Sequence, residues 1–489
     1  MNHSNVNTRK SALGVLISVF FFWGFVAASN DILIPVFKEK LNLKQWQSQM
    51  ISFAFYVAYT IGSLIYYALS KALKKDLLNR MGYKNGIALG LTISAIGTFM
   101  FYPAAALSSF PLMISGLFIV GLGFSLQQTA ANPLAIVMGD PKKGSQRLSL
   151  AGGINNLGTT IGPFIVSYAI FGSMNSSAAE ISIDSIKLPY MILGLAFLLV
   201  ALVFKFSSIP NTVESISSET ISPDKSRSPK ASELEKKSAL NYPQLWMGMI
   251  AIFLYVGVEV STASNLPEFM KQELKYTSDN IAPFVSLFWA SLMIGRWTGS
   301  VGAFSLQLPI KRMLQFLMPY VAFMVFILIN LIAGKNIQIF YPYFFVILVL
   351  VIGDILSKGN PSRQLLLYSL FGIVALFVGM LSSGYTSVFA FISVGLFCST
   401  LWPCIFTLAI AGLGKHTNEG SGFLIMMIMG GGFISLLQGV LAEQNLLGIQ
   451  WSYMVGVACF TYLAFYAFRV SQILKSQGID TGNTETVSH

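Results

Sequence analysis

Long apolar runs recur along the whole chain, and short polar segments separate them. A helix of about 20 residues crosses the hydrocarbon core of a bilayer, and all its backbone hydrogen bonds are made within the helix. Only 10% of the residues are charged, against about 25% in a soluble domain. The sequence therefore predicts an all-α polytopic membrane protein.

The lengths and spacing of these runs predict fourteen spans. We expect them near residues 12–37, 48–70, 85–104, 110–138, 147–172, 189–207, 243–270, 281–303, 313–333, 338–357, 364–381, 385–413, 419–443 and 449–470. A polar stretch rich in Ser, Glu and Lys follows the sixth span and is typical of a flexible linker. The expected domains are a six-helix bundle over 1–207, a cytoplasmic linker over 208–242, a second bundle over 243–470 and a cytoplasmic tail over 471–489.

The positive charges favour one orientation in the membrane. With the N-terminus in the cytoplasm, segments on that side hold 24 of the 31 Lys and Arg residues. This is the positive-inside pattern, so the net charge of +11 reflects topology and not a nucleic-acid partner. We expect a multi-pass protein of the inner membrane with both termini in the cytoplasm. No cleavable signal peptide is expected, because the first run is long and more spans follow it.

The two halves of the chain share weak internal similarity. Pro133 in the fourth expected span corresponds to Pro403 in the twelfth, and the glycines at 152–153 correspond to those at 430–432. Transporters use repeated six-helix units with interrupted helices to build a site at the membrane midplane, so we expect each proline to break its helix. On this register the second half has two helices too many, and we place them as an inserted hairpin at about 313–357.

Asp31 lies near the end of the first apolar run, directly after Asn30. An ionised carboxylate is costly inside a bilayer and usually faces a cavity where it has a function. Asp31 is therefore a candidate for binding a proton or another cation during transport. The alternative is a shorter span that Asp31 caps at the external interface, close to Lys38 and Lys40.

Amide side chains gather beside Pro133 in the first half. Gln128 and Asn132 are four residues apart and share a helix face, while the proline frees a carbonyl in the preceding turn. Several directed donors and acceptors suit the hydroxyl groups of a sugar. Asn155 in the next span is a further candidate. The alternative role of such amides is hydrogen bonding between helices.

Three residues of the second half are candidates. Glu259 is a carboxylate deep in the seventh span, and the alternative to a functional role is a buried partner for hydroxyls or amides of another helix. Trp402 is suited to stacking on a pyranose ring, although a tryptophan also packs well on account of its bulk. Gln438 is an isolated amide for which packing is an equal alternative.

Several classes of function are not indicated. The chain has no nucleotide-binding GxxxxGK[ST] motif, and its three histidines form no metal-binding pattern. Nothing resembles a nucleophile with its base. We therefore expect no enzyme activity, and no cofactor other than a coupling proton or sodium ion.

At these residues the chain resembles the major facilitator superfamily, and within it the fucose:proton symporter family of sugar permeases. The matching segments include Asn-Asp-Ile-Leu-Ile-Pro at 30–35, Thr-Ala-Ala-Asn-Pro at 129–133 and Trp-Pro-Cys-Ile-Phe-Thr-Leu at 402–408. Gln128 and the stretch 255–261 are more similar to the glucose/galactose permease branch than to fucose permease. The resemblance implies two six-helix bundles around a central site that works by alternating access.

The resemblance also implies roles for individual residues. Asp31 matches an aspartate implicated in proton coupling, and Asn155 matches a sugar-binding amide. Gln128 stands where the fucose permease has an acidic residue, so Glu259 is the candidate for a second functional carboxylate. Gly152 stands where the fucose permease has Gln, which argues against fucose itself.

The predicted function is import of a neutral hexose, such as a glucose/galactose-like sugar, fucose or an amino-sugar derivative, by cation-coupled symport. The coupling residues would be Asp31 and Glu259. The predicted sugar contacts are Asn30, Gln128, Asn132, Asn155, Trp402 and Gln438. We expect a monomer in a lipid bilayer with no nucleic-acid partner. The alternatives are an exporter of the same fold and a sugar sensor that does not transport.

Overall fold

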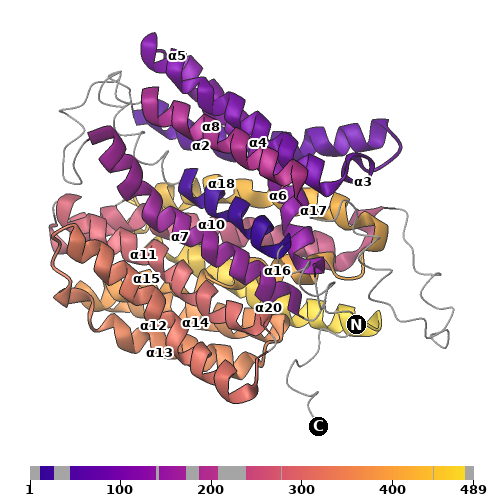
Figure 1. Ribbon diagram of the computed structural model, residues 1–489. Helices are drawn as coiled ribbons and strands as arrows, with labels where there is room; N and C mark the ends of the chain where they lie inside the picture. Colours follow the sequence, from indigo (N-terminus) through magenta and orange to yellow (C-terminus); the bar gives the residue numbers. More distant parts are fainter. Residues whose placement is uncertain are drawn as a thin grey trace.

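The protein is helical throughout the part of the chain that the computed structural model describes (Figure 1). The described residues are 12–26, 45–138, 143–171, 187–207, 238–276, 278–304, 306–443 and 445–479. No strand occurs in these ranges. The predicted all-α fold class is confirmed.

The first half contains the helical segment Ala12–Val26 and seven labelled helices. These are α2 (Gln45–Ala72), α3 (Leu77–Met81), α4 (Tyr83–Phe99), α5 (Phe101–Ala106), α6 (Phe110–Val137), α7 (Gly144–Phe171) and α8 (Lys187–Phe206). Helix α6 packs against α2 and α4, and α4 also packs against α8. The result is one bundle, which lies mostly in the upper part of Figure 1.

The second half begins with the short turn η5 (Ala239–Asn241). Its helices are α10 (Pro243–Leu274), α11 (Ser278–Ser300) with η6 (Val301–Ala303), α12 (Leu308–Ile332), η7 (Gln338–Phe340) with α13 (Tyr343–Ser357), α14 (Pro361–Leu381), α15 (Gly384–Cys398), α16 (Leu401–Ile410), η8 (Gly414–His416) with α17 (Thr417–Met426), η9 (Met427–Met429) with α18 (Gly430–Leu441), α19 (Gly448–Trp451) and α20 (Met454–Ser476). Helix α10 is central to this half, because it packs against α16, α18 and α20.

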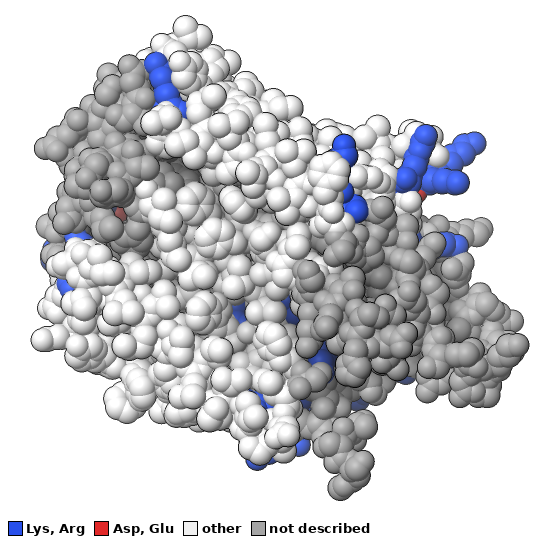
Figure 2. Space-filling model, in the orientation of Figure 1, with Lys and Arg blue, Asp and Glu red and all other residues white. Residues whose placement is uncertain are grey.

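Eleven helices of the described residues are long and apolar enough to cross a membrane. The other expected spans coincide with the shorter apolar helix Ala12–Val26 and with helices α7 and α11. The total of fourteen spans stays a prediction. On the face drawn in Figure 2, Lys and Arg lie mainly towards the helix ends and the area between is largely uncharged, as contact with lipid requires.

Helices α12 and α13 form a hairpin at the edge of the second half (Figure 1). They pack against α11, α14 and α15, and their outer faces expose large apolar residues such as Ile332 and Phe345. This peripheral position is what we expect of an inserted hairpin. The domain boundaries themselves stay predictions.

One expectation about the prolines is wrong. Helix α6 runs through Pro133 without a break and ends at Val137. A proline removes one main-chain N–H donor, and a side chain of a neighbouring helix can donate to the carbonyl that this leaves without a partner. In the second half the chain does leave the helix between α15 and α16, just before Pro403.

The two halves meet mainly in two regions, one around α7 and one around α17. Helix α7 lies beside α11 (Figure 1), and α17 packs against both α2 and α6. The glycine pair of α7 permits the first of these contacts: a Cβ atom at Gly153 would lie 2.7 Å from Cδ1 of Trp297. The indole of Trp297 donates a hydrogen bond of 3.1 Å to the Gly153 carbonyl.

Candidate functional site

A guanidinium group lies between the two halves of the molecule. Arg296 of α11 donates from Nη1 to Oδ1 of Asn156 at 2.9 Å and to the Gly152 carbonyl at 3.4 Å, both on α7. Its Nε donates to the Ser399 carbonyl at 2.9 Å. That carbonyl is available because Pro403, four residues later, has no N–H. Arg296 therefore joins α7 to the interruption between α15 and α16.

The same guanidinium reaches the predicted coupling carboxylate of the second half. Nη2 of Arg296 donates to the Tyr255 hydroxyl at 3.3 Å, and that hydroxyl donates to Oε2 of Glu259. Tyr255 and Glu259 are one turn apart on α10. Glu259 is half-buried, whereas Tyr255 is 1% exposed. The arginine and the carboxylate are thus connected through one hydroxyl group.

Trp402 belongs to the same region. Its ring centroid lies 6.2 Å from that of Tyr255 and 5.8 Å from that of Phe406, and the side chain is half-buried. The structure therefore brings together two of the predicted residues, Glu259 and Trp402, with Tyr255 between them.

Arg296 is the residue that the sequence reasoning missed. It stands inside the expected span 281–303. A charged residue within an apolar run is itself a signal of function or of pairing. Its partner Asn156 directly follows the predicted sugar contact Asn155 in the sequence.

The predicted amides of the first half bond to their own bundle. Nε2 of Gln128 donates to the Tyr59 hydroxyl at 3.0 Å, and Nδ2 of Asn155 donates to the Phe20 carbonyl at 2.9 Å. Both amides are half-buried. These bonds fit the alternative role of linking helices, and a part-exposed amide is also able to exchange such a bond for one to a ligand.

Asn132 and Gln438 lie deeper. Asn132 is 1% exposed, and its Nδ2 has no hydrogen-bond partner among the described residues. Gln438 is fully buried, and its Nε2 lies 3.4 Å from Oγ of Ser452 within the second half. This geometry favours packing for Gln438. Asn30 and Asp31 lie outside the described residues, and the predicted roles of all these residues stay predictions.

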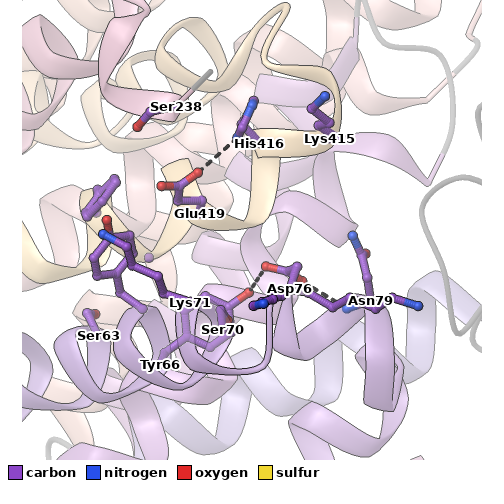
Figure 3. A pocket seen from close by; sticks show the side chains of 15 residues that line it. Ser63, Tyr66, Ser70, Lys71, Asp76, Asn79, Ser238, Lys415, His416 and Glu419 are labelled. Atoms are coloured by element: carbon purple, nitrogen blue, oxygen red, sulfur yellow. Dashed lines mark hydrogen bonds and ion pairs between the residues drawn. The ribbon is translucent and has the colours of Figure 1, made fainter. Parts of the chain in front are cut away.

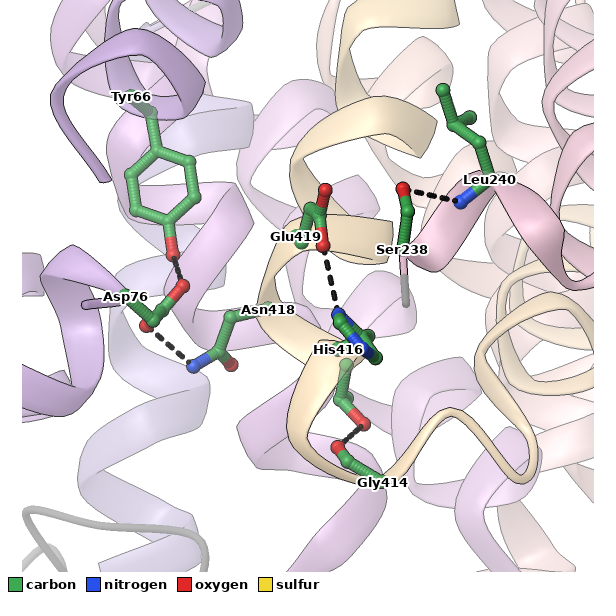
Figure 4. A network of polar contacts seen from close by, with 9 residues as sticks. Tyr66, Asp76, Ser238, Leu240, Gly414, His416, Asn418 and Glu419 are labelled. Atoms are coloured by element: carbon green, nitrogen blue, oxygen red, sulfur yellow. Dashed lines mark hydrogen bonds and ion pairs between the residues drawn. The ribbon is translucent and has the colours of Figure 1, made fainter. Parts of the chain in front are cut away.

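A second polar contact joins the halves at the end of α2. Tyr66 donates to Oδ2 of Asp76 at 2.5 Å, and Nδ2 of Asn418 in α17 donates to Oδ1 of Asp76 at 2.9 Å (Figure 4). Asn418 also donates to Asn79 at 3.1 Å and accepts a hydrogen bond from Tyr83. The start of α17 is therefore tied to the loop and short helix that follow α2.

A pocket of about 590 Å³ opens beside this contact (Figure 3). Side chains of both halves line it, and lysines predominate among the charged ones. The charged lining residues are Lys71, Lys74, Lys75, Asp76, Lys415, His416 and Glu419. His416 and Glu419 bond each other at 2.9 Å. The lysines are those of the side predicted to be cytoplasmic.

No group of three or more His, Cys, Asp and Glu side chains that could hold a metal ion occurs among the residues whose placement the structure gives. In the described contacts around Arg296, the polar groups are instead amides, hydroxyls, main-chain carbonyls, the guanidinium and the carboxylate of Glu259. Such a set can bind uncharged polar molecules and can take up or release a proton at Glu259.

Comparisons with known proteins agree with this architecture. The family model described as Major Facilitator Superfamily matches residues 12–356. The chain is 30% identical over 469 residues to a glucose/galactose transporter of Brucella abortus, which covers 95% of this chain and 96% of that protein. It is 25% identical over 469 residues to an L-fucose-proton symporter of Escherichia coli, covering 93% of this chain and 91% of that protein.

A solved structure shows the same fold. The crystal structure of the Escherichia coli fucose:proton symporter matches with a TM-score of 0.69 and 24% identity, and covers 95% of this chain and 100% of that chain. The resemblance inferred from the sequence is therefore confirmed, including the greater similarity to the glucose/galactose branch.

Proposed function

This chain belongs to the Major Facilitator Superfamily, and on that premise we propose that it is a symporter that imports a neutral hexose together with a proton. It is a multi-pass membrane transporter and not an enzyme. The relatives named as glucose/galactose transporter and L-fucose-proton symporter support a monosaccharide as the substrate. The greater similarity to the former favours a glucose- or galactose-like hexose.

The polar contact around Arg296 and Glu259 carries this proposal. It places an ionisable carboxylate next to the contact between α7 and α11. Alternating access requires that contact to form and separate in each cycle. A proton on Glu259 and a sugar bound nearby would then both shift the equilibrium between the joined and the separated state of this contact. Two ligands that shift the same conformational equilibrium are coupled to each other.

We assign proton coupling to two carboxylates, one in each half of the chain. Asp31 carries the role that the sequence resemblance implies, and Glu259 is its counterpart in the second half. Gln128, Asn132 and Asn155 supply amide contacts to the sugar, and the remaining predicted contacts are Asn30, Trp402 and Gln438. We further propose a monomer in the bacterial inner membrane with both termini in the cytoplasm.

Uptake into proteoliposomes tests the function. A panel of radiolabelled hexoses is offered with no gradient, with an inward proton gradient and with an inward sodium gradient. We expect accumulation of a glucose- or galactose-like sugar only with the proton gradient. Sodium-driven accumulation would reassign the ion, and retained sugar binding without any uptake would favour a sensor. Active export from loaded vesicles would favour an exporter.

Variants of the carboxylates test the coupling. We expect Asp31→Asn and Glu259→Gln each to abolish proton-driven accumulation while sugar exchange down its gradient continues, because exchange does not require a proton to be released. If Asp31→Asn left both accumulation and exchange unchanged, its coupling role would be wrong.

A further inference from the structure

The guanidinium of Arg296 is almost fully engaged by protein groups. An arginine side chain has five N–H donors. Its hydrogen bonds go to the Ser399 carbonyl, Asn156, the Gly152 carbonyl and the Tyr255 hydroxyl. With four acceptors in place, this side chain is suited to holding helices together and poorly suited to binding a sugar directly.

Gly152 leaves the room that this arrangement needs. A Cβ atom there would lie 3.1 Å from Cδ of Arg296 and 3.2 Å from its Nη1, which is closer than ordinary van der Waals contact. The absent side chain thus explains the glycine that the sequence comparison singled out. The guanidinium takes the place where a longer residue at 152 would project.

The Tyr255 hydroxyl determines the direction of the two hydrogen bonds between Arg296 and Glu259. A phenol has one proton to donate, and here it is donated to Glu259 while the oxygen accepts from Arg296. An ionised carboxylate can only accept, which matches this arrangement. A protonated Glu259 can donate its own proton to Tyr255. The hydroxyl proton of Tyr255 would then turn towards the guanidinium, which has no acceptor.

We propose that Arg296 is a positioning residue that transmits the ionisation of Glu259, through the Tyr255 hydroxyl, to the contact between α7 and α11. With Glu259 ionised, Arg296 is held on Asn156 and the two halves stay together at this level. With Glu259 protonated, the hydroxyl turns, the negative charge that stabilises the guanidinium is lost, and the contact loosens. This inference rests on the proposed function, because it explains how a bound proton would change the state of the transporter.

Three titratable groups neighbour Glu259 among the residues that the structure describes. They are Arg296 of α11, Tyr255 on α10 itself and the Cys398 thiol of α15. Cys398 is fully buried and makes no hydrogen bond to Glu259 among the described contacts. The connection through Tyr255 is thus the direct route from the carboxylate to the other half.

Pulsed electron paramagnetic resonance measures distances between the two halves and does not require sugar transport. Spin labels are placed on Lys75→Cys in the first half and Leu240→Cys in the second, both exposed in the structure. The populations of short and long distances are recorded across pH without sugar. In the protein that carries only the two labels, we expect the ratio of the long-distance to the short-distance population to rise as the pH falls. The rise should be at least about fivefold, because coupling between two sites usually changes an equilibrium by that factor or more.

Three variants then separate the steps. Glu259→Gln should favour long distances at every pH, since it mimics the protonated acid. Tyr255→Phe removes only the hydroxyl group and should abolish the pH response. Arg296→Gln should lose both the response and the short-distance population. Tyr462→Phe is the matched control, because its hydroxyl donates only to the Met247 carbonyl, and it should respond as the unchanged protein does.

The possible outcomes are distinct. A normal pH response in Tyr255→Phe, together with its loss in Glu259→Gln, would overturn the connection through the hydroxyl. A normal response in Arg296→Gln would overturn the role of the arginine. Absence of hexose uptake with the predicted distance changes intact would contradict the proposed function alone.

Discussion

The hydroxyl group of Ser421 in α17 donates a hydrogen bond of 2.9 Å to the main-chain carbonyl of Thr129 in α6. That carbonyl would normally accept from the N–H group four residues later, but Pro133 has none. The second half repeats the relationship: Pro403 frees the Ser399 carbonyl, which accepts from Arg296. Each proline thus offers an acceptor to a side chain of another helix. In the first half that side chain comes from the opposite bundle.

We expect Ser421→Ala to weaken the contact between α6 and α17. The variant leaves the buried Thr129 carbonyl without a partner, which costs about 1–3 kcal/mol, and the smallest value already corresponds to a roughly fivefold change in a conformational ratio. Distances between labels at 75 and 240, measured at fixed pH, should shift towards longer values.

Ser393→Ala is the control for this variant. Ser393 is 4% exposed, and its hydroxyl donates to the Ala390 carbonyl in the same helix at 2.7 Å. Equal distance distributions for the two variants would contradict a specific role of Ser421.

The glycine pair of α7 gives a second prediction. In Gly153→Ala the new methyl group would lie 2.7 Å from Cδ1 of Trp297, so α7 and α11 must move apart. We expect a smaller short-distance population and slower sugar exchange in reconstituted vesicles. Gly432→Ala is the matched control, since nothing lies within 4 Å of a Cβ there. Similar losses in both variants would indicate a general effect on helix stability.

The fold was predictable because the bilayer restricts the possibilities. Apolar runs of spanning length must be helices, so composition and spacing were sufficient for the all-α class, and the order of the spans follows. The prolines show the limit of this reasoning. The freed carbonyl at Thr129 was expected, but whether the helix breaks depends on its neighbours. Ser421 supplies the missing donor, and α6 continues.

The site was predictable only in part. Glu259 and Trp402 stood out as individual residues, but Arg296 and its partner Asn156 are 140 residues apart in the chain. No local pattern predicts such a pairing. The selection of Asn155 was decided by resemblance, and one residue along a helix turns a side chain by about 100°. That rotation directs Asn155 to its own bundle and Asn156 to the opposite one.

Asp354 of α13 is a buried carboxylate that the sequence reasoning did not select, and it supports a third prediction. It is 6% exposed, and it accepts from Gln315 of α12 at 2.7 Å and from Gln364 of α14 at 3.1 Å. Asp354→Ala removes both bonds: the bond from Gln315 holds α12 to α13 within the hairpin, and the bond from Gln364 fastens the hairpin to α14. Hydrogen bonds between membrane helices are worth about 0.6 kcal/mol on average, so we expect a loss of roughly 1–2 kcal/mol and a lower melting temperature in detergent.

Two further variants give this test its controls. Asp354→Asn keeps an acceptor oxygen and should lose less stability than the alanine variant. Glu268→Ala removes an exposed carboxylate of α10 that bonds Gln272 at 2.9 Å, and its melting temperature should not change. If Asp354→Ala melted at the temperature of the unchanged protein, the carboxylate would not anchor the hairpin.

Neighbouring glutamines of α6 give the last prediction, because the structure assigns them different environments. Gln127 is fully buried, accepts from the Trp23 indole at 2.6 Å and donates to Ser94 at 3.0 Å. Gln128 is half-buried with one bond to Tyr59. We expect Gln127→Ala to lower the melting temperature and to leave the hexose affinity of the folded protein unchanged.

Gln128→Ala should behave in the opposite way, with little change in melting temperature and an affinity about 2- to 10-fold weaker, the value of one hydrogen bond. Calorimetric titration with the transported hexose measures the affinity, and thermal unfolding of the same samples measures the stability. Each variant serves as the control for the other, since both remove the same amide from adjacent positions. Unchanged affinity in Gln128→Ala would show that its amide links α6 to α2 and does not contact the sugar.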